Sequence, residues 1–201
     1  MNIGVLALQG GYQTHIDYLN RLGVFCSRVR DRRALITSDA LIIPGGESSV
    51  LIKLLKQQQL WTSLIDYDKP ILGICAGAIL LAKTVLSPTQ DSLGRISICA
   101  TRNAYGRQLA SQVVSGQCIV RDLAMEMVFI RAPKLTPLEN ADIKVLAKYQ
   151  DQIVAVQENN VIAASFHPEL SLDNYLHRYF IQQVACSTAN LKLNKTVNCR
   201  A

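Results

Sequence analysis

Aromatic residues are scarce in this chain: they make up 6% of its 201 positions, and only one of them is a tryptophan. None lies between Cys26 and Leu41, where four arginines are concentrated at positions 28, 30, 32 and 33. A nucleic-acid surface typically combines basic side chains with aromatic rings that stack on bases. The net charge of +6 therefore predicts a solvated or partner-facing surface at Arg28–Arg33, and no nucleic-acid partner.

Cysteine pairs with the spacing of metal ligands are also missing. The six cysteines, at positions 26, 75, 99, 118, 186 and 199, are scattered and include no CxxC pair. This spacing excludes a zinc-ribbon type of site and argues against a disulfide scaffold in a chain of this length. We therefore expect no metal, and mostly free thiols in a reducing compartment.

Long apolar runs are absent as well. The N-terminus has no basic residue before its short apolar run, which differs from a secretory signal peptide. Uncharged apolar stretches such as Pro70–Ala82 are shorter than the roughly 18 residues that a membrane span requires. We expect a cytoplasmic protein with no membrane association.

The chain does have a repeated order of strand, glycine turn and helix. Ile3–Leu8 is a continuous apolar run that ends at Gln9-Gly10-Gly11, and apolar residues then follow at helical spacing up to Leu22. The same order recurs at residues 40–55 and at residues 70–86. Strands that are apolar on both faces are typical of a parallel sheet covered by helices. The sequence thus predicts an α/β fold: a three-layer, mostly parallel, flavodoxin-like sheet with helices on both faces.

The middle of the chain has a different pattern. Shorter apolar runs separated by polar turns predict strands with mixed or antiparallel pairing, at Ile96–Ala100, Gln117–Val120, Met127–Ile130, Ile143–Tyr149 and Gln152–Gln157. A buried strand at Val161–Phe166 and a closing helix at Leu172–Ala185 complete a single domain, residues 1–186. The polar segment 187–201 has little periodicity, and we expect a loosely ordered C-terminal tail.

Cys75 lies where a buried strand meets a helix, in the sequence Gly73-Ile74-Cys75-Ala76-Gly77. The small neighbours permit a sharp turn that would lift a nucleophile above the sheet edge, and the N–H groups at a helix N-terminus favour a thiolate. Taken alone, the position is equally consistent with a buried core cysteine, which is the commonest place for a free thiol.

The tripeptide His167-Pro168-Glu169 follows the last buried strand. Pro168 disfavours helical backbone at His167, which predicts an extended segment in which residues two apart share a face. His167 and Glu169 can then act as a base and the carboxylate that fixes its tautomer. A surface turn without function is the alternative. The position at the sheet edge where α/β folds bind ligands favours catalysis.

Pro44-Gly45-Gly46-Glu47-Ser48-Ser49 forms a third loop at a strand end. Its two glycines allow the backbone to present N–H groups to an oxyanion, and Glu47 can bind an ammonium group. The alternative is ordinary turn chemistry, in which Ser48 or Ser49 only caps the following helix.

These loops together resemble the site of a class I (triad) glutamine amidotransferase, in the order and spacing of Pro44–Ser49, Gly73–Gly77 and His167–Leu170. Three further motifs narrow the resemblance to the glutaminase subunits of pyridoxal 5'-phosphate synthase, the PdxT family: Gln9-Gly10, Arg102–Gln108 and Phe129–Pro133.

The resemblance extends over nearly the whole chain, from Ile3 to Phe180. One departure is Ile74, which stands where the family more commonly has threonine. We expect this change to have a modest effect on packing beneath the cysteine, because no proposed step uses that hydroxyl.

The resemblance also implies a role for each matching residue. Cys75 would be the nucleophile, His167 the general acid and base, and Glu169 the orienting carboxylate. The backbone N–H groups of Gly46 and Ala76 would form the oxyanion hole. The residues that would hold L-glutamine are Gly46, Glu47, Ser48, Arg102, Ile130 and Arg131. No metal or organic cofactor is implied.

The implied partner is the synthase subunit, a PdxS-like (β/α)₈ barrel that consumes the ammonia and forms a hetero-oligomer with the glutaminase. Two alternatives remain. A glutaminase subunit of histidine or purine biosynthesis would share the triad but lack the Arg102–Gln108 and Phe129–Pro133 motifs. A non-catalytic flavodoxin-like redox protein could have a cysteine at this turn but would not need His167-Pro168-Glu169.

Two other histidines have no place in this scheme. We expect His15 to be half-exposed on the first helix, with the partner-facing rim as the alternative, and His177 to lie on the surface of the last helix. The remaining cysteines are interpreted as structural or incidental thiols.

Overall fold

The computed structural model describes residues 1–102, 104, 111–173 and 175–198, with side chains up to residue 189. Its helices are α1 (Tyr12–Arg21), α2 (Arg32–Thr37), α3 (Ser48–Gln57), α4 (Trp61–Ile65), α5 (Ala76–Leu81) and α6 (Tyr175–Asn198), with a 3-10 turn at Pro168–Leu170. Its strands are β1 (Ile3–Leu6), β2 (Cys26–Val29), β3 (Ala40–Ile43), β4 (Ile71–Ile74), β5 (Ala82–Leu86), β6 (Ile96–Thr101), β7 (Ser111–Cys118), β8 (Leu123–Ile130), β9 (Lys134–Pro137), β10 (Lys144–Tyr149), β11 (Gln152–Glu158) and β12 (Val161–Ala164).

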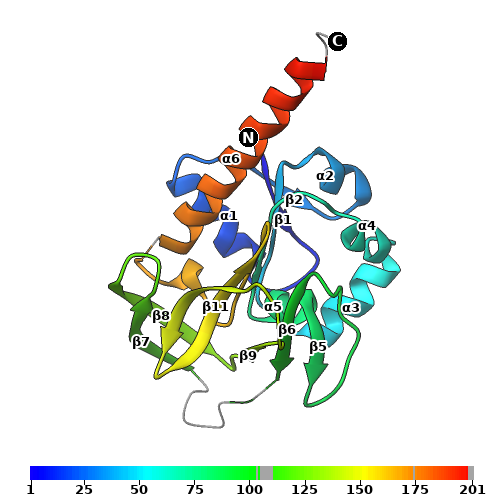
Figure 1. Ribbon diagram of the computed structural model, residues 1–201. Coiled ribbons are helices and arrows are strands. Elements are labelled where there is room, and N and C mark those ends of the chain that lie inside the picture. The colour runs from blue at the N-terminus through cyan, green and yellow to red at the C-terminus, as the bar shows by residue number, and fades with distance from the viewer. Residues whose placement is uncertain (103, 105–110, 174, 199–201) are drawn as a thin grey trace.

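Within the described residues, nine strands form one sheet in the order β2-β1-β3-β4-β12-β11-β10-β7-β8. The half from β2 to β12 is parallel, and the half from β12 to β8 is antiparallel. A smaller sheet is formed by β5, β6 and β9 (Figure 1). The predicted α/β class and the antiparallel pairing in the middle of the chain are confirmed.

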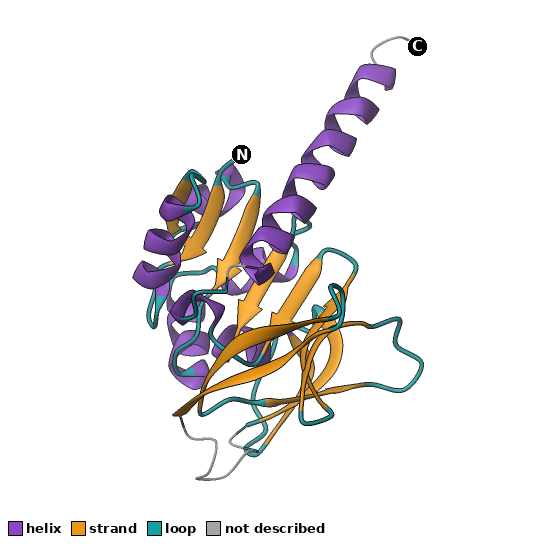
Figure 2. Ribbon diagram, turned by 90° about the vertical axis from the view of Figure 1, so that its left-hand side faces the viewer, coloured by secondary structure: helices purple, strands orange, loops and turns teal. Residues whose placement is uncertain are grey.

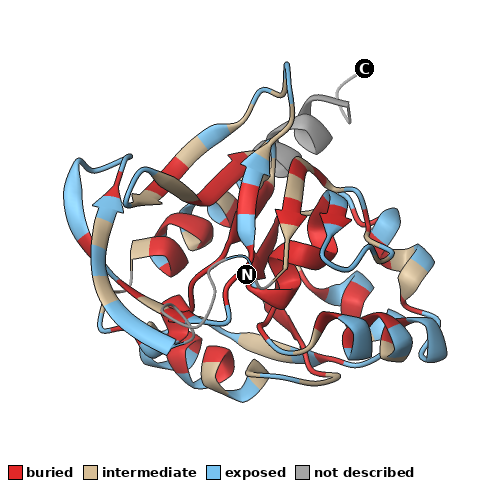
Figure 3. Cartoon of the chain, turned by 90° about the horizontal axis from the view of Figure 1, so that it is seen from below, coloured by how far each residue is buried: buried red, intermediate tan, exposed pale blue. Residues whose placement is uncertain are grey.

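Apolar side chains are buried on both faces of the nine-stranded sheet, which produces three layers. On one face α1 and α6 cover alternate residues of the strands, such as Val5 and Ile74, with Leu19 and Phe180. On the other face α2 to α5 and the small sheet pack against residues such as Ile43. The central strands are buried along their length, as Figure 3 shows. This burial explains why their sequences are continuously apolar rather than alternating.

The third predicted helix ends earlier than expected. The helical spacing at residues 76–86 predicted one element, whereas α5 stops at Leu81 and the chain continues as strand β5 from Ala82. β5 pairs in parallel with β6. The β-branched residues Thr84 and Val85 favour a strand, and this local preference was hidden by an apolar pattern that fits both structures.

The arginine-rich segment is an edge of the sheet. β2 ends the strand order and carries Arg28, which donates a hydrogen bond to Gln13 Oε1 at 2.7 Å. Arg30 donates to the carbonyl oxygen of Ala7 at 3.2 Å, and Asp31 caps α2 by accepting from the backbone N–H of Ala34. Charged residues on an edge strand discourage pairing with another chain, so part of the cluster has a structural use.

The last helix is longer than predicted. It was expected over Leu172–Ala185 but runs from Tyr175 to Asn198, and its second half extends away from the body of the protein (Figure 2). The backbone of residues 187–198 is therefore helical, whereas the domain boundary at residue 186 stays a prediction. Across the described residues, no helix combines the length and the apolar character that crossing a membrane would require.

We predict that Gly77→Ala destabilises the protein by about 1–3 kcal/mol, because a Cβ there overpacks the contact between α5 and β3. It would lie 2.2 Å from the carbonyl oxygen of Ile43. Urea unfolding followed by circular dichroism measures the change. Gly11→Ala is the matched control, since its Cβ comes no closer than 3.8 Å to Glu169 Oε1. Equal stability of the two variants would contradict the prediction.

Candidate active site

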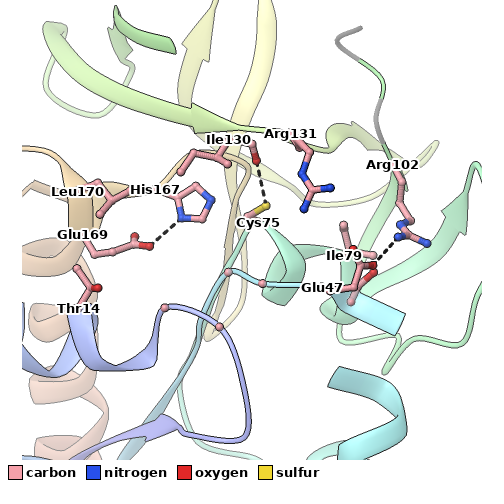
Figure 4. A pocket seen from close by; sticks show the side chains of 15 residues that line it. Thr14, Glu47, Cys75, Ile79, Arg102, Ile130, Arg131, His167, Glu169 and Leu170 are labelled. Atoms are coloured by element: carbon pink, nitrogen blue, oxygen red, sulfur yellow. Dashed lines mark hydrogen bonds and ion pairs between the residues drawn. The ribbon is translucent and has the colours of Figure 1, made fainter. Parts of the chain in front are cut away.

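A cleft of about 340 Å³ opens at the carboxyl ends of β3, β4 and β12 (Figure 4). It contains almost all of the residues that the sequence singled out: Gly46, Glu47, Ser48, Cys75, Arg102, Ile130, Arg131, His167 and Glu169 line it, together with Gly10, Gly11, Thr14, Gly45, Ile79 and Leu170. Ala76, the remaining predicted residue, follows Cys75 as the first residue of α5. Segments from the beginning, middle and end of the chain therefore meet at one site.

Cys75 occupies a strained turn between β4 and α5. Its φ of 50° and ψ of −100° are unusual for a residue with a side chain. The backbone holds the turn in place, because the Cys75 N–H donates to the carbonyl oxygen of Ala164 at 2.8 Å and the Cys75 carbonyl accepts from Ile79 at 3.0 Å. The thiol is directed toward the carbonyl oxygen of Ile130 at 3.8 Å. The Ala76 N–H has no acceptor within the helix, because it belongs to the first turn.

His167 and Glu169 form the predicted pair, with Nδ1 and Oε1 2.8 Å apart. The backbone N–H of His167 donates to the carbonyl oxygen of Val128 at 2.8 Å, which fixes the residue against β8. The backbone differs from our prediction. His167 avoids the helical region, with a φ of −105° and a ψ of 86°, but it is not extended, and Pro168–Leu170 form a 3-10 turn, because proline is well suited to the first position of a helical turn. The turn still brings the two side chains together.

The surroundings favour a charged His167. Burial disfavours the imidazolium, but the interactions of His167 with Cys75 and Glu169 outweigh burial and raise the pKa of His167 to about 10. Burial alone would raise the pKa of the Glu169 carboxyl, but the neighbouring His15 and His167 lower it. Glu169 is therefore a carboxylate, and a His167 imidazolium can stabilise negative charge on the Cys75 sulfur and deliver a proton.

The loop at residues 45–47 is attached to the loop at residues 9–11. The Gln9 side chain donates to the Glu47 carbonyl oxygen at 3.2 Å and accepts from the Glu47 N–H at 3.3 Å. The Gly11 N–H donates to the carbonyl oxygen of Gly45 at 3.1 Å. Glycine is needed at position 45, because a Cβ would lie 2.3 Å from His167 Cε1. The sequence predicted the glycines but not the role of Gln9.

Gln90 connects two of the predicted substrate-binding residues. Its Oε1 accepts from Ser48 Oγ at 3.0 Å and from Arg102 Nη1 at 3.1 Å. Arg102 Nη2 also forms an ion pair with Glu47 Oε1 at 2.7 Å. Ser48 therefore does not act as a helix cap, and Glu47 interacts with a guanidinium group of its own chain. Gln90 lies outside every recognised motif, so nothing in its local sequence indicated this role.

Arg131 and Ile130 line the cleft from the end of β8, and Arg131 has a positive φ of 44°. Figure 4 shows the Arg131 side chain between Cys75 and Glu47. Of the motif Arg102–Gln108, residues 103 and 105–108 lie outside the described residues. No group of three His, Cys, Asp or Glu that could hold a metal ion is found in the described part of the chain.

Both remaining histidines were predicted wrongly. His15 and His177 were expected to be half-exposed and on the surface, respectively, but both have 0% exposure. His15 Nδ1 lies 3.2 Å from His177 Nε2, and His15 Nε2 lies 3.5 Å from Glu169 Oε2. The two residues are 162 positions apart. Their burial depends on α1 and α6 packing on the same face of the sheet, which the sequence of neither helix reveals.

Comparison with known proteins shows the family of the chain. Residues 5–186 match the SNO glutamine amidotransferase family. A protein from Koribacter versatilis described as pyridoxal 5'-phosphate synthase subunit PdxT is 43% identical, over 92% of this chain and 96% of the relative. A protein from Methanocorpusculum labreanum with the same description is 44% identical, over 92% of this chain and 98% of the relative.

A crystal structure described as a glutamine amidotransferase superposes with a TM-score of 0.84 at 38% identity, covering 91% of this chain and 98% of the other. The structure of PurLQS from Thermotoga maritima shares the fold alone, with a TM-score of 0.65 at 15% identity. The fold and these matches thus define a glutamine amidotransferase. The chain belongs to the SNO glutamine amidotransferase family.

We predict that Gln90→Ala raises the KM for glutamine about 3- to 30-fold with little change in kcat. The substitution removes an acceptor that positions Ser48 and Arg102, and a hydrogen bond contributes about 0.5–1.5 kcal/mol, somewhat more when one partner is charged. Steady-state kinetics of glutamate release measure both constants. Gln58→Ala, at the exposed residue that follows α3, is the control. A lower kcat with an unchanged KM would argue against this role.

We also predict that acid destabilises the protein through its buried histidines. Burial lowers the pKa of His177 from 6.5 to about 3, and burial likewise lowers the pKa of His15. Below pH 6.5 the unfolded state binds protons that the folded state excludes. The free energy of unfolding should therefore fall by about 1.4 kcal/mol per pH unit for each such proton.

Urea unfolding between pH 5 and pH 7 measures this dependence. His177→Leu should make the slope of stability against pH shallower, because one of these protons is then removed from both states. Identical slopes for the unmodified chain and the variant would show that His177 does not contribute to the acid sensitivity.

Proposed function

We propose that Cys75, His167 and Glu169 are the catalytic triad that hydrolyses the side-chain amide of L-glutamine to L-glutamate and ammonia. The chain is the glutaminase subunit of pyridoxal 5'-phosphate synthase, which supplies ammonia for vitamin B6 synthesis. The observation that carries the residue assignment is the His167–Glu169 pair, 2.8 Å apart, in the same cleft as a cysteine on a strained turn.

The proposed reaction has two halves. The Cys75 sulfur attacks the amide carbonyl of glutamine, and the N–H groups of Gly46 and Ala76 stabilise the oxyanion, each contributing up to about 3 kcal/mol to lowering the barrier. His167 protonates the amide nitrogen, which leaves as ammonia. The glutamyl group then remains bound to Cys75 as a thioester. His167 then removes a proton from water, and the hydroxide releases glutamate from the sulfur. Glu169 keeps His167 in one tautomer and stabilises its imidazolium form.

The charged groups of the cleft suit a free amino acid. Arg131 and Arg102 offer guanidinium groups to the α-carboxylate, and Glu47 offers a carboxylate to the α-ammonium group. Gly46, Ser48 and Ile130 complete the proposed set around the substrate. Glu47 and Arg102 are paired with each other in this structure, so bound glutamine would have to share or replace that ion pair.

We propose that the partner is the PdxS-like barrel that consumes the ammonia, in a hetero-oligomer, and that docking activates the glutaminase. A flip of the Gly45–Gly46 peptide would complete the oxyanion hole. In this structure the Gly45 carbonyl accepts a hydrogen bond from the Gly11 N–H, so the flip must break a bond that holds the peptide in place. A cytoplasmic location also stays a proposal. The free thiols at Cys26, Cys75 and Cys118 suit a reducing compartment.

Glutamate release from L-glutamine, measured with and without the synthase subunit, tests the proposal. We expect the synthase to raise the rate at least about 10-fold, because one missing oxyanion donor costs about two to three orders of magnitude. Cys75→Ala should abolish release under both conditions, whereas Cys118→Ala, which replaces a buried cysteine outside the cleft, should leave it unchanged.

The result also separates the parts of the proposal. Equal turnover with and without the synthase would contradict activation by docking. Full activity of Cys75→Ala would contradict the assignment of the nucleophile.

A further inference from the structure

The carboxylate of Glu169 has one oxygen that the proposed triad does not use. Oε1 faces His167, but Oε2 is buried and makes no hydrogen bond to the described residues. A buried carboxylate oxygen without a donor is costly, and N–H groups are the usual compensation. His15 Nε2 lies 3.5 Å from Oε2, close enough for a hydrogen bond after a small rotation of either side chain.

His15 is in turn supported by His177. The second ring nitrogen of His15, Nδ1, lies 3.2 Å from His177 Nε2, and both rings have 0% exposure. The His177 ring stacks on Tyr18 with centroids 4.5 Å apart, and the Tyr18 hydroxyl donates to the carbonyl oxygen of Asp173. The two imidazoles and Glu169 therefore form a continuous polar row from α6 through α1 to the cleft.

The positions of the protons in this row follow from the carboxylate at one end. The carboxylate can only accept, so the nitrogen of His15 that faces Glu169 must carry hydrogen. Nδ1 of neutral His15 is then an acceptor, and His177 Nε2 must donate to it. The remaining nitrogen, His177 Nδ1, is then an acceptor, and it makes no hydrogen bond among the described residues. The opposite tautomers would place a lone pair of His15 against the carboxylate.

A neutral donor suits the chemistry better than a cation. Burial lowers the pKa of both His15 and His177, so both rings are uncharged at neutral pH. The charged groups that face them are Glu169 and His167, with Asp173 and Arg21 near Tyr18. An uncharged His15 orients the carboxylate and leaves its negative charge available to the His167 imidazolium.

We propose that His15 is a positioning residue for glutamine hydrolysis: its Nε2–H holds Oε2 of Glu169, and His177 fixes the tautomer of His15 that makes this possible. The inference rests on the proposed roles of His167 and Glu169. His15 does not contact the reacting atoms. It acts by keeping the carboxylate in the plane that orients His167, much as outer partners orient the histidine ligands of metal sites.

A pair of amide substitutions tests this role in the complex with the synthase subunit. The His15→Gln side chain reaches as far as Nε2 and still offers an N–H to Glu169. The His15→Asn side chain has the same amide group but reaches only as far as Nδ1. We expect His15→Asn to lower kcat about 10- to 100-fold with KM changed less than about 3-fold, and His15→Gln to retain kcat within about 3-fold.

A double-mutant cycle distinguishes a positioning role of His15 from a purely structural one. If His15 acts through Glu169, the 10- to 100-fold loss should shrink to less than about 3-fold when His15→Asn is introduced into Glu169→Gln. Glutamate release by Glu169→Gln can be too slow to measure. The rate of Cys75 alkylation by iodoacetamide, followed by peptide mass spectrometry, then gives the effect of His15→Asn with and without Glu169→Gln. His177→Leu should lower kcat in the same direction as His15→Asn, and it replaces His15→Asn if that variant does not fold.

Three results would overturn the inference: full kcat in His15→Asn, equal losses in the Asn and Gln variants when both are folded, or an undiminished loss in the Glu169→Gln background. Cys75→Ala is measured alongside. Activity in that variant would refute the triad itself, whereas an inactive Cys75→Ala with a fully active His15→Asn would refute only the role of His15.

Discussion

The pairing of β4 with β12 is the constraint on which the site depends. These two strands are parallel neighbours in the centre of the sheet, and Ile74 lies opposite Ala164. Cys75 follows one of these residues immediately and His167 follows the other by three positions, so both leave the sheet at the same edge. The hydrogen bond from the Cys75 N–H to the Ala164 carbonyl extends this pairing by one residue. A slip in register would separate the thiol from the imidazole, because neighbouring positions face opposite sides of a strand.

Glycine loops complete the site by allowing close approach of the backbone. Gly45 packs against the His167 ring, and Gly10 packs against the Gly45 carbonyl at a φ of 79° where a Cβ would lie only 1.9 Å from the oxygen. Such contacts leave no room for side chains, and they hold the residue 45–47 loop against His167 and the loop at residues 9–11. Gln9, attached to both backbone polar groups of Glu47, gives this loop one conformation. An activating partner must therefore supply enough interaction energy to change it.

The parts of the site that the sequence predicts are those encoded within one short segment. The turn at Cys75, the pair His167 and Glu169, and the glycine loop at Gly45-Gly46 each carry their own local signal. Gln90 and the pair His15 and His177 carry none, because their contacts join positions 42 and 162 residues apart. The fold shows the same limit. Buried parallel strands were recognisable from apolar runs, whereas the end of α5 at Leu81 depends on β5 joining the small sheet.

Covalent trapping would test the central claim most directly. A chloroketone analogue of glutamine, added to the chain together with the synthase subunit, should alkylate Cys75 alone among the six cysteines, as peptide mass spectrometry would show, and excess L-glutamine should protect it. This result would place the nucleophile at the turn between β4 and α5, beside His167. Labelling of a different cysteine, or labelling of Cys75 without protection by glutamine, would contradict the account.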